Sequence, residues 1–282
     1  MNSPPVDHAV SRQLLEIASA AALRVGAYLL EHNGARVEHE EKAGFYDPVT
    51  EYDRQAERLI AEHIFREWPD SAVVGEEGGR QGSGAVVWYV DPIDGTNNFV
   101  TGIPFFCISI AAMVGGSIVA GVVFDPVRNE LMAASTVGAY LNGQRIRSSG
   151  QASDSTAVLS TGFPYSGGRA SPEDVDLFGK LTARFRAVRR LGSTALELAY
   201  VACGRVDLTF QTNANPWDVA AGMLLVQQAG GRYLALGTER PDWDSEPWMS
   251  PVFIAACPEF DLARSSVGEL LAMPYAGPPA QA

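Results

Sequence analysis

The segment Trp88–Phe99, with the sequence WYVDPIDGTNNF, constrains the fold of this 282-residue chain more than any other segment. It continues a short apolar run, Val86–Val90, which we expect to form a buried strand that stops at Asp91. Pro92 stiffens the turn that follows, and Asp94 comes three residues after Asp91. Any fold of this chain must therefore bury the strand and still place two carboxylates together at its end.

The turn after this strand carries groups suited to binding ions. Two carboxylates at this spacing can bridge metal ions, and the carbonyl of Ile93 between them is a further hard oxygen ligand. Gly95 lets the backbone approach a ligand closely, so its N–H and that of Thr96 can hold a phosphate oxygen. An Asx-turn at a strand end explains the same DxxDG pattern without any ligand. The pattern alone leaves both explanations open.

Two other segments place acids where an element begins or ends. Glu76 and Glu77 are adjacent between glycines, and adjacent carboxylates repel unless they are solvated or neutralised by a cation. Asp218 lies in the first turn of a helix predicted to start with Asn215 as N-cap and Pro216 at its first position. The helix dipole explains an acid there. The small residues that follow indicate a buried helix end, where an acid needs a partner.

A fourth acidic segment, DPVTEYD at Asp47–Asp53, precedes a predicted helix that ends before Pro69. Thr50 and Asp53 have the spacing of a capping box, which by itself explains Asp53. Lys42 lies a short way upstream. Capping and chemistry both remain open for this segment.

Hydrophobic periodicity predicts antiparallel strands early in the chain and alternating strands and helices later. The clearest early elements are a helix from about Asp7 to His32 and a hairpin that joins Phe105–Met113 to Ile118–Phe124. This order of elements indicates a layered α/β protein with two sheets. We interpret the chain as a single unit, and its parts are sub-halves 8–150 and 151–272 and a flexible tail, 273–282.

Composition narrows the classes of partner. The formal net charge of −12 argues against nucleic acid, because a phosphate backbone is bound by a basic surface. Three cysteines without a CxxC pair indicate buried thiols in a reducing cytoplasm. The first ten residues lack the pattern of a signal peptide, and no apolar run reaches the ~18 residues of a spanning helix. We therefore expect a cytoplasmic protein that binds neither nucleic acid nor membrane.

Taken in order, DPVTEYD, GEE, DPIDGTNNF and PWDVAAG resemble the inositol monophosphatase family of lithium-sensitive, metal-dependent phosphatases. The resemblance extends from about Leu14 to Leu271. It implies alternating α-β-α-β-α layers with two mixed sheets, as in sugar phosphatases. It also implies hydrolysis of a phosphate monoester by metal-activated water, and a homodimer.

The resemblance assigns roles to particular residues. Up to three Mg²⁺ ions, which Mn²⁺ can replace, would be held by Glu76, Asp91, the main chain of Ile93, Asp94 and Asp218. Thr96 and Asp53 would orient the attacking water, and Glu76 counts with them as catalytic. Contacts to phosphate or substrate are expected from Gly95, Thr96, Ser193, Thr194, Gln211 and Asp218. Glu77 resembles a supporting acid, and Lys42 matches a lysine of a mobile N-terminal loop.

The identity of the substrate alcohol stays open at this stage. Inositol-selective relatives have a glutamate seven residues before the aspartate of WD, where this chain has Gln211. A neutral amide donates as well as accepts, so it is no charged anchor for hydroxyl groups. Ser193 and Thr194 can contact a polyol or simply start a helix. The expected substrate is inositol monophosphate or a related sugar or polyol phosphate; histidinol phosphate, fructose 1,6-bisphosphate and a non-catalytic regulatory role are the alternatives.

Overall fold

The computed structural model describes residues 7–32, 39–41, 48–164, 170–236 and 246–268. The predicted supporting residue Lys42 and the predicted tail, 273–282, lie outside the described residues.

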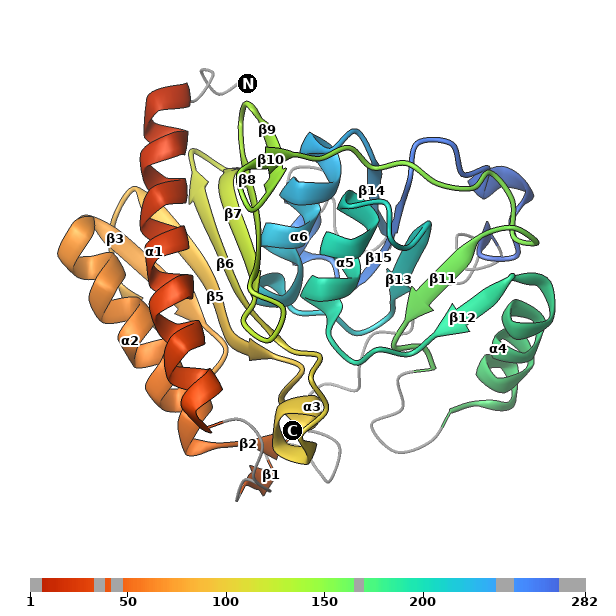
Figure 1. Ribbon diagram of the computed structural model, residues 1–282, viewed down its shortest axis with the longest axis horizontal. Coiled ribbons are helices and arrows are strands. Elements are labelled where there is room, and N and C mark those ends of the chain that lie inside the picture. The colour runs from red at the N-terminus through yellow and green to blue at the C-terminus, as the bar shows by residue number, and fades with distance from the viewer. Residues whose placement is uncertain (1–6, 33–38, 42–47, 165–169, 237–245, 269–282) are drawn as a thin grey trace.

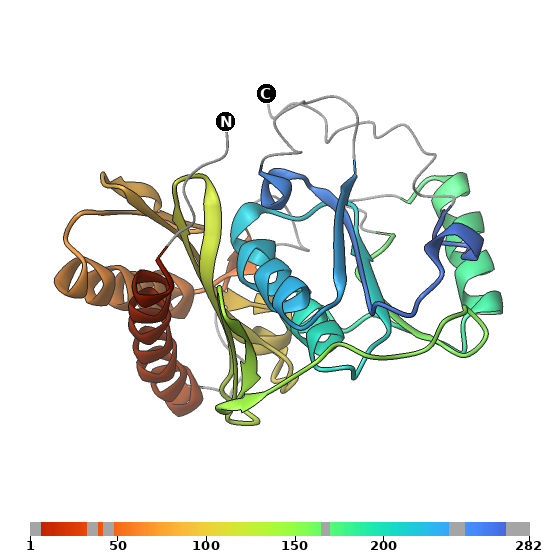
Figure 2. The ribbon, with the colours of Figure 1, turned by 90° about the horizontal axis from the view of Figure 1, so that it is seen from above.

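Helices and two large sheets alternate in α-β-α-β-α layers, which confirms the predicted fold class (Figure 1, Figure 2). Helices α1 and α2 cover one face of the first sheet, α5 and α6 lie between the two sheets, and α4 lies beyond the second. The helices are α1 (His8–His32), α2 (Glu51–Glu67), α3 (Thr96–Thr101), α4 (Pro172–Arg184), α5 (Thr194–Ala202) and α6 (Pro216–Gln228). Two short 3-10 turns are η2 (Pro247–Met249) and η3 (Leu262–Arg264).

The first sheet has eight strands in the order β10-β9-β8-β7-β6-β5-β3-β4. All neighbours pair antiparallel except β3 and β5, which are parallel. Its strands are β3 (Ser71–Gly75), β4 (Gly79–Gly82), β5 (Val86–Asp94), β6 (Cys107–Val114), β7 (Ser117–Asp125), β8 (Glu130–Ser135), β9 (Gly138–Leu141) and β10 (Gln144–Arg145).

The second sheet has five strands in the order β12-β11-β13-β15-β14. Strands β12, β11 and β13 are parallel, and β15 runs antiparallel to both of its neighbours. Its strands are β11 (Val158–Thr161), β12 (Ala187–Arg189), β13 (Leu208–Gln211), β14 (Arg232–Leu236) and β15 (Val252–Ala256). A separate two-stranded ladder joins β1 (Glu40–Glu41) to β2 (Pro48–Val49).

Three apolar clusters fill the interfaces between these layers. One lies between α1, α2 and the first sheet, with Trp88 and Ile60 among its fully buried members. The second joins both sheets through α5 and α6. The third packs α4 and η3 against the second sheet around Phe210. The middle cluster fixes both helices that approach the candidate site.

Helix α1 has the length and apolar composition of a membrane-spanning helix, and it alone does so among the helices in the described part of the chain. Its sequence contains no uninterrupted apolar run of spanning length, because charged residues such as Glu16 and Arg24 interrupt it. In this fold Leu14, Val25 and Leu29 are completely buried in the cluster against the first sheet.

Strand β5 corrects one prediction, because it continues to Asp94 and does not stop at Asp91. Pairing with β6 is interrupted between Asp91 and Asp94 and resumes where Asp94 faces Cys107. Such a bulge bends a strand and changes the direction of its side chains. The short helix α3, which starts directly after Gly95, was not predicted from the sequence.

Candidate active site

The end of β5 lies where the first turns of α2, α5 and α6 come together. Asp53 from α2 is hydrogen-bonded to Thr96 at the start of α3. Asp94 accepts hydrogen bonds from the first turn of α5, and it interacts electrostatically with Asp218 in the first turn of α6. In Figure 1 this junction lies near the lower end of β5, beside α3. Segments far apart in the sequence therefore contribute acids to one place.

Asp91 lies at the centre of this group of acids. Its side chain is buried, and burial raises its pKa well above the ordinary value. Negative charges on Glu76, Asp94 and Asp218 raise it further, in that order. Burial likewise raises the pKa of Asp218, with Asp94 and Glu76 as the next causes. Asp91 and Asp94 are buried, whereas Glu76 and Asp218 are half-buried. The four carboxylates repel one another, and a cation would relieve that repulsion.

Part of this group is already held by protein donors. Asp94 Oδ2 accepts from Ser193 Oγ at 2.5 Å and from Ala195 N at 2.7 Å, and Thr194 N lies 3.2 Å from Oδ1. Asp218 Oδ2 accepts from Asn215 N at 2.8 Å. These bonds oppose the effect of burial on each pKa. They also fix the direction of both carboxylates.

The donor atoms suit a hard divalent cation. Every predicted ligand atom is an oxygen, the preference of Mg²⁺ and Mn²⁺. Across the described ranges, no three His, Cys, Asp or Glu side chains are already gathered in a metal-binding arrangement. Asp94 and Asp218 keep unused lone pairs beside their protein donors. The residues fit the ion by charge and chemistry, and the metal-ligand assignments stay predictions.

Asp53 and Thr96 form a second pair beside the group of acids. The capping box predicted for Thr50 and Asp53 is confirmed: Thr50 N lies 2.8 Å from Asp53 Oδ2. The other carboxylate oxygen, Oδ1, accepts from Thr96 Oγ1 at 3.2 Å. Burial raises the pKa of Asp53 to about 6, against the opposing effect of its hydrogen bonds, and nearby Glu77 raises it further. Asp53 therefore does more than cap a helix.

The hydroxyl group of Thr96 has two acceptors for its single hydrogen. Oγ1 lies 3.2 Å from Asp53 Oδ1 and 2.9 Å from the carbonyl oxygen of Ile93. Only one of these bonds is made at a time, and the oxygen keeps lone pairs for a donor such as water. Thr96 therefore connects the carboxylate of Asp53 to the DPIDG turn.

Gly95 adopts a conformation that other residues rarely adopt, with φ of 98°. A Cβ atom there would lie 3.1 Å from the carbonyl oxygens of both Gly192 and Phe105. Both the positive φ angle and the lack of space for a Cβ atom require glycine at this position. The predicted contact of Gly95 with phosphate stays a prediction.

Glu57 is a residue of the site that the sequence reasoning missed. Its buried carboxylate accepts from Glu77 N and Gly78 N, both at 2.7 Å, and so shapes the turn that carries Glu76. A Cβ atom on Gly75 would lie 2.3 Å from this carboxyl group, so only glycine fits there. One signal was available: Glu57 follows Asp53 by four residues on the same face of α2.

Ser193 and Thr194 were predicted to contact a polyol or to start a helix. They do start α5, with Ser193 as N-cap. The Ser193 hydroxyl and the Thr194 N–H both turn toward Asp94. Cys107 lies behind the same carboxylate, with Sγ 3.7 Å from Asp94 Oδ2, and burial raises the pKa of this thiol. The three residues therefore surround Asp94, and a contact of Ser193 or Thr194 with substrate stays a prediction.

Gln211 ends β13 and is buried. Its Oε1 accepts from Gly162 N at 3.0 Å, and its Nε2 donates to Glu197 Oε2 at 2.9 Å. Glu197 is completely buried on α5, and burial raises its pKa to about 7. The sequence reasoning missed this acid, although it lies in the first turn of α5.

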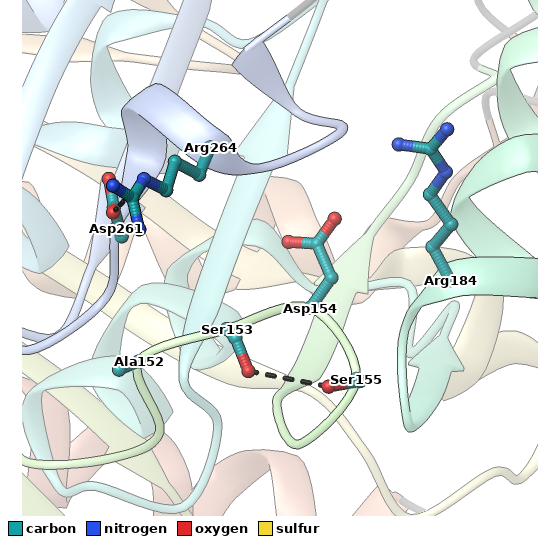
Figure 3. A pocket seen from close by; sticks show the side chains of 7 residues that line it. All are labelled: Ala152, Ser153, Asp154, Ser155, Arg184, Asp261 and Arg264. Atoms are coloured by element: carbon teal, nitrogen blue, oxygen red, sulfur yellow. Dashed lines mark hydrogen bonds and ion pairs between the residues drawn. The ribbon is translucent and has the colours of Figure 1, made fainter.

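A surface pocket of about 490 Å³ lies elsewhere, near the end of α4 and η3 (Figure 3). Arg184 and Arg264 line it together with Asp154 and Asp261, so its charges balance. Asp154 is also bonded to Ser266. None of the predicted site residues lines this pocket.

Comparisons with known proteins agree with this geometry. A family model described as the inositol monophosphatase family matches residues 11–263. The Nus factor SuhB of Xylella fastidiosa is 40% identical over 225 residues, covering 79% of this chain and 82% of that protein. The fructose-1,6-bisphosphatase/inositol-1-monophosphatase of Thermotoga maritima is 44% identical over 213 residues, covering 74% and 79%. The structure of inositol monophosphatase from Anabaena superposes with a TM-score of 0.77 at 32% identity, covering 94% of this chain and 98% of that one.

Proposed function

The chain belongs to the inositol monophosphatase family and is a phosphoric monoester hydrolase, and we propose that it hydrolyses a small polyol or sugar phosphate with Mg²⁺. One observation supports the metal dependence most. Asp91 and Asp94 are buried, Glu76 and Asp218 are half-buried, and the four carboxylates repel one another. A protein keeps such a group together when a cation binds it.

The proposed ligands are oxygens only: Glu76, Asp91, the Ile93 carbonyl, Asp94 and Asp218. Up to three Mg²⁺ ions would bind there, and Mn²⁺ would replace them. When bound, they would offset the charge of the phosphate and lower the pKa of the attacking water. The protein's own share is positioning, because phosphoryl transfer needs little covalent help from side chains.

Thr96 and Asp53 would receive the proton of the attacking water. Thr96 Oγ1 accepts a hydrogen bond from the water while its own hydrogen points to Asp53 Oδ1. With a pKa of about 6, Asp53 is mostly ionised at neutral pH and can take the proton through Thr96. The water oxygen bonds to phosphorus as the bond to the ester oxygen breaks. The leaving alkoxide takes one proton from solvent, Asp53 gives the proton it received back to solvent, and inorganic phosphate is the second product.

The phosphate would also meet the backbone of the DPIDG turn. The N–H groups of Gly95 and Thr96 lie where the chain enters α3, and glycine permits a close approach there. Glu57 would act on the chemistry indirectly, because it holds the turn that carries Glu76 and Glu77.

Inositol monophosphate is the first candidate substrate and fructose 1,6-bisphosphate the second. One relative from Thermotoga maritima bears both activities in its name and is 44% identical. Histidinol phosphate is a third candidate substrate. We also propose that the protein is a cytoplasmic homodimer and that lithium inhibits it.

A second function is favoured by the names of other relatives. Several proteins about 40% identical to this chain are called Nus factor SuhB. A regulatory role as a protein factor, alongside hydrolysis, is therefore the second candidate. If the folded wild-type protein hydrolyses none of the tested phosphate esters, the regulatory role without hydrolysis would be favoured.

Phosphate release from a panel of esters tests the proposal. The panel contains inositol 1-phosphate, fructose 1,6-bisphosphate, histidinol phosphate and an aryl phosphate, each with Mg²⁺ and with excess chelator. We expect turnover with Mg²⁺, its loss with chelator, and inhibition by roughly tens of millimolar Li⁺, by competition at a weak site. Full turnover in excess chelator would contradict the metal mechanism.

A further inference from the structure

The buried pair of Glu197 and Gln211 lies on the second-sheet side of the candidate site. Neutral donors surround the Glu197 carboxylate, and the Ser160 hydroxyl on β11 also lowers its pKa. Gln211 Nε2 lies 2.9 Å and Thr209 Oγ1 3.2 Å from Oε2, and Leu191 N lies 3.4 Å from Oε1. Both carboxylate oxygens are therefore used as acceptors by separate segments of the chain.

These contacts allow only one orientation of the Gln211 amide. Gly162 N donates to Oε1, so that end must be an acceptor. Rotating the amide by 180° would point its NH₂ group at the Gly162 N–H, and two donors would face each other. A Cβ atom on Gly162 would lie 2.7 Å from Gln211 Oε1, so the backbone approaches the amide as closely as only glycine allows. This orientation holds whether Glu197 is ionised or protonated.

We propose that Glu197 is a positioning residue that sets which hydrogen-bonding group Gln211 presents to the substrate alcohol. With Oε1 committed to Gly162 and one N–H committed to Glu197, the second N–H of Gln211 is the donor left over. The pair thus favours substrate hydroxyl groups that accept a hydrogen bond. This proposal rests on the proposed hydrolysis of a polyol or sugar phosphate.

The same helix connects this pair to the group of acids around Asp91. The first turn of α5 donates to Asp94, and Glu197 follows within the same short helix. A displacement of Glu197 would thus be felt by Asp94 as well as by Gln211.

Exchange of the two side chains tests the assignment, because hydrogen-bond counting distinguishes the single variants from the double one. Gln211→Glu alone places a second carboxylate 2.9 Å from Glu197, and the two must share a proton. Glu197→Gln alone leaves at least one of the donors around position 197 without an acceptor. In the double variant, the new amide at position 197 donates to the new carboxylate at position 211. Gly162 N and Leu191 N then both keep acceptors.

The experiment compares four proteins: wild type, Glu197→Gln, Gln211→Glu and the double exchange. Each is assayed for thermal unfolding and for kcat and KM on inositol 1-phosphate and on an aryl phosphate. Glu173→Gln, the same chemical change on the exposed face of α4, is the matched control. For Glu197→Gln we expect the ratio of kcat/KM for inositol 1-phosphate to that for the aryl phosphate to fall about fivefold, chiefly through KM.

In the double exchange we expect recovery of thermal stability toward the wild type. We also expect a gain of about tenfold in the same ratio, because a charged acceptor now meets vicinal hydroxyl groups. Gln211→Glu alone should be less stable than the double exchange and should not show that gain.

Two results would overturn the proposal. In one, Gln211→Glu alone is stable and matches the double exchange in preference. In the other, the four proteins differ in stability and share one substrate ratio, which makes the pair purely structural. A wild type without any Mg²⁺-dependent hydrolysis defeats the proposed function instead. The coupling between positions 197 and 211 is still read from thermal unfolding in that case.

Discussion

Two acidic regions lie beside the first turn of α5, and they balance their charge in different ways. Around Asp91, the largest influences after burial are other carboxylates. Around Glu197, the largest influences after burial are neutral hydrogen-bond donors, and the charge of Asp94 comes after them. The first region accumulates negative charge, and the second holds a single acid in a network of matched hydrogen bonds.

The difference separates a site that needs a ligand from one that does not. Hydrogen bonds satisfy the second region within the protein. In the first region they satisfy parts of Asp94 and Asp218, and the repulsion among the acids persists. A cation would therefore relieve repulsion in the first region, whereas the acceptors of the second are already matched by protein donors.

The largest expected effect is that of Asp91→Asn. Activity should fall by about 10³-fold or more, because a metal ligand and its charge are lost. The metal-free variant should be more stable than the metal-free wild type, since one of four repelling charges is gone. The Asn side chain can still accept from Ile93 N, which now lies 3.0 Å from Asp91 Oδ1. Steady-state kinetics and urea unfolding in chelator measure both effects.

Glu197→Gln is the matched comparison for that stability measurement. It is also a buried acid-to-amide change, but it chiefly removes an acceptor from neutral donors, and the repulsion from Asp94 is a smaller influence. At about pH 5, below the pKa of Glu197, the free energy of unfolding should fall by about 1–2 kcal/mol. A stability change of the same sign in both variants would end the contrast between the two regions.

A change in pH is expected to have an intermediate effect on the free energy of unfolding of the metal-free protein. A carboxyl group whose pKa is raised by folding binds its proton more tightly in the folded state, so stability falls as pH rises. For Asp53, with a pKa of about 6, the loss runs from about pH 4 to about pH 6. For Glu197, with a pKa of about 7, it continues to about pH 7. Each raised pKa corresponds to roughly 3 kcal/mol.

Thermal unfolding between about pH 5 and pH 8, with and without Mg²⁺, measures this dependence. The Glu197→Gln variant should lack the part of the pH dependence of stability that comes from Glu197. Mg²⁺ should stabilise the protein more at pH 8 than at pH 5, because ionised ligands bind it better. Equal stabilisation by Mg²⁺ at both pH values would be evidence against a carboxylate site.

The smallest effect is expected from Glu57→Gln. The amide keeps the shape but offers one acceptor oxygen where Glu77 N and Gly78 N need two. The Glu76 turn should loosen, and Mg²⁺ affinity and kcat/KM should each fall by about tenfold. Glu62→Gln, an exposed change on the same helix, is the control. Mg²⁺ affinity equal to that of the control would remove Glu57 from the site.

The sequence predicts the layered fold and the elements that carry acids, because periodicity and caps are local properties. Asn215, Pro216 and Asp218 start α6 as predicted, and Thr50 with Asp53 starts α2. The predicted end of β5 was wrong by three residues, because the strand ends at Asp94 and not at Asp91. Proline cannot donate to a ladder, so Pro92 indicated an end, but the bulge accommodates it and pairing resumes at Asp94.

The partners of the buried acids could not be read from local patterns. Glu57 is hydrogen-bonded to a turn twenty residues downstream, and Glu197 on α5 is hydrogen-bonded to Gln211 at the end of β13. Ser193 is bonded to Asp94 across 99 positions of sequence. Such contacts depend on how the sheets pack, and spacing along the chain carries no information about them.

The close packing of α6 has a consequence for how this protein is made. A Cβ atom on Gly121 of β7 would lie 2.9 Å from Ala221, and one on Gly222 would lie 2.5 Å from Leu198 of α5. The first sheet is therefore shaped to receive a helix that the ribosome delivers only after most of the chain has emerged. Until then, its inner face is uncovered and Asp218 is missing from the group of acids. The nascent chain thus passes through a stage in which it exposes an apolar surface and cannot yet bind its metal fully.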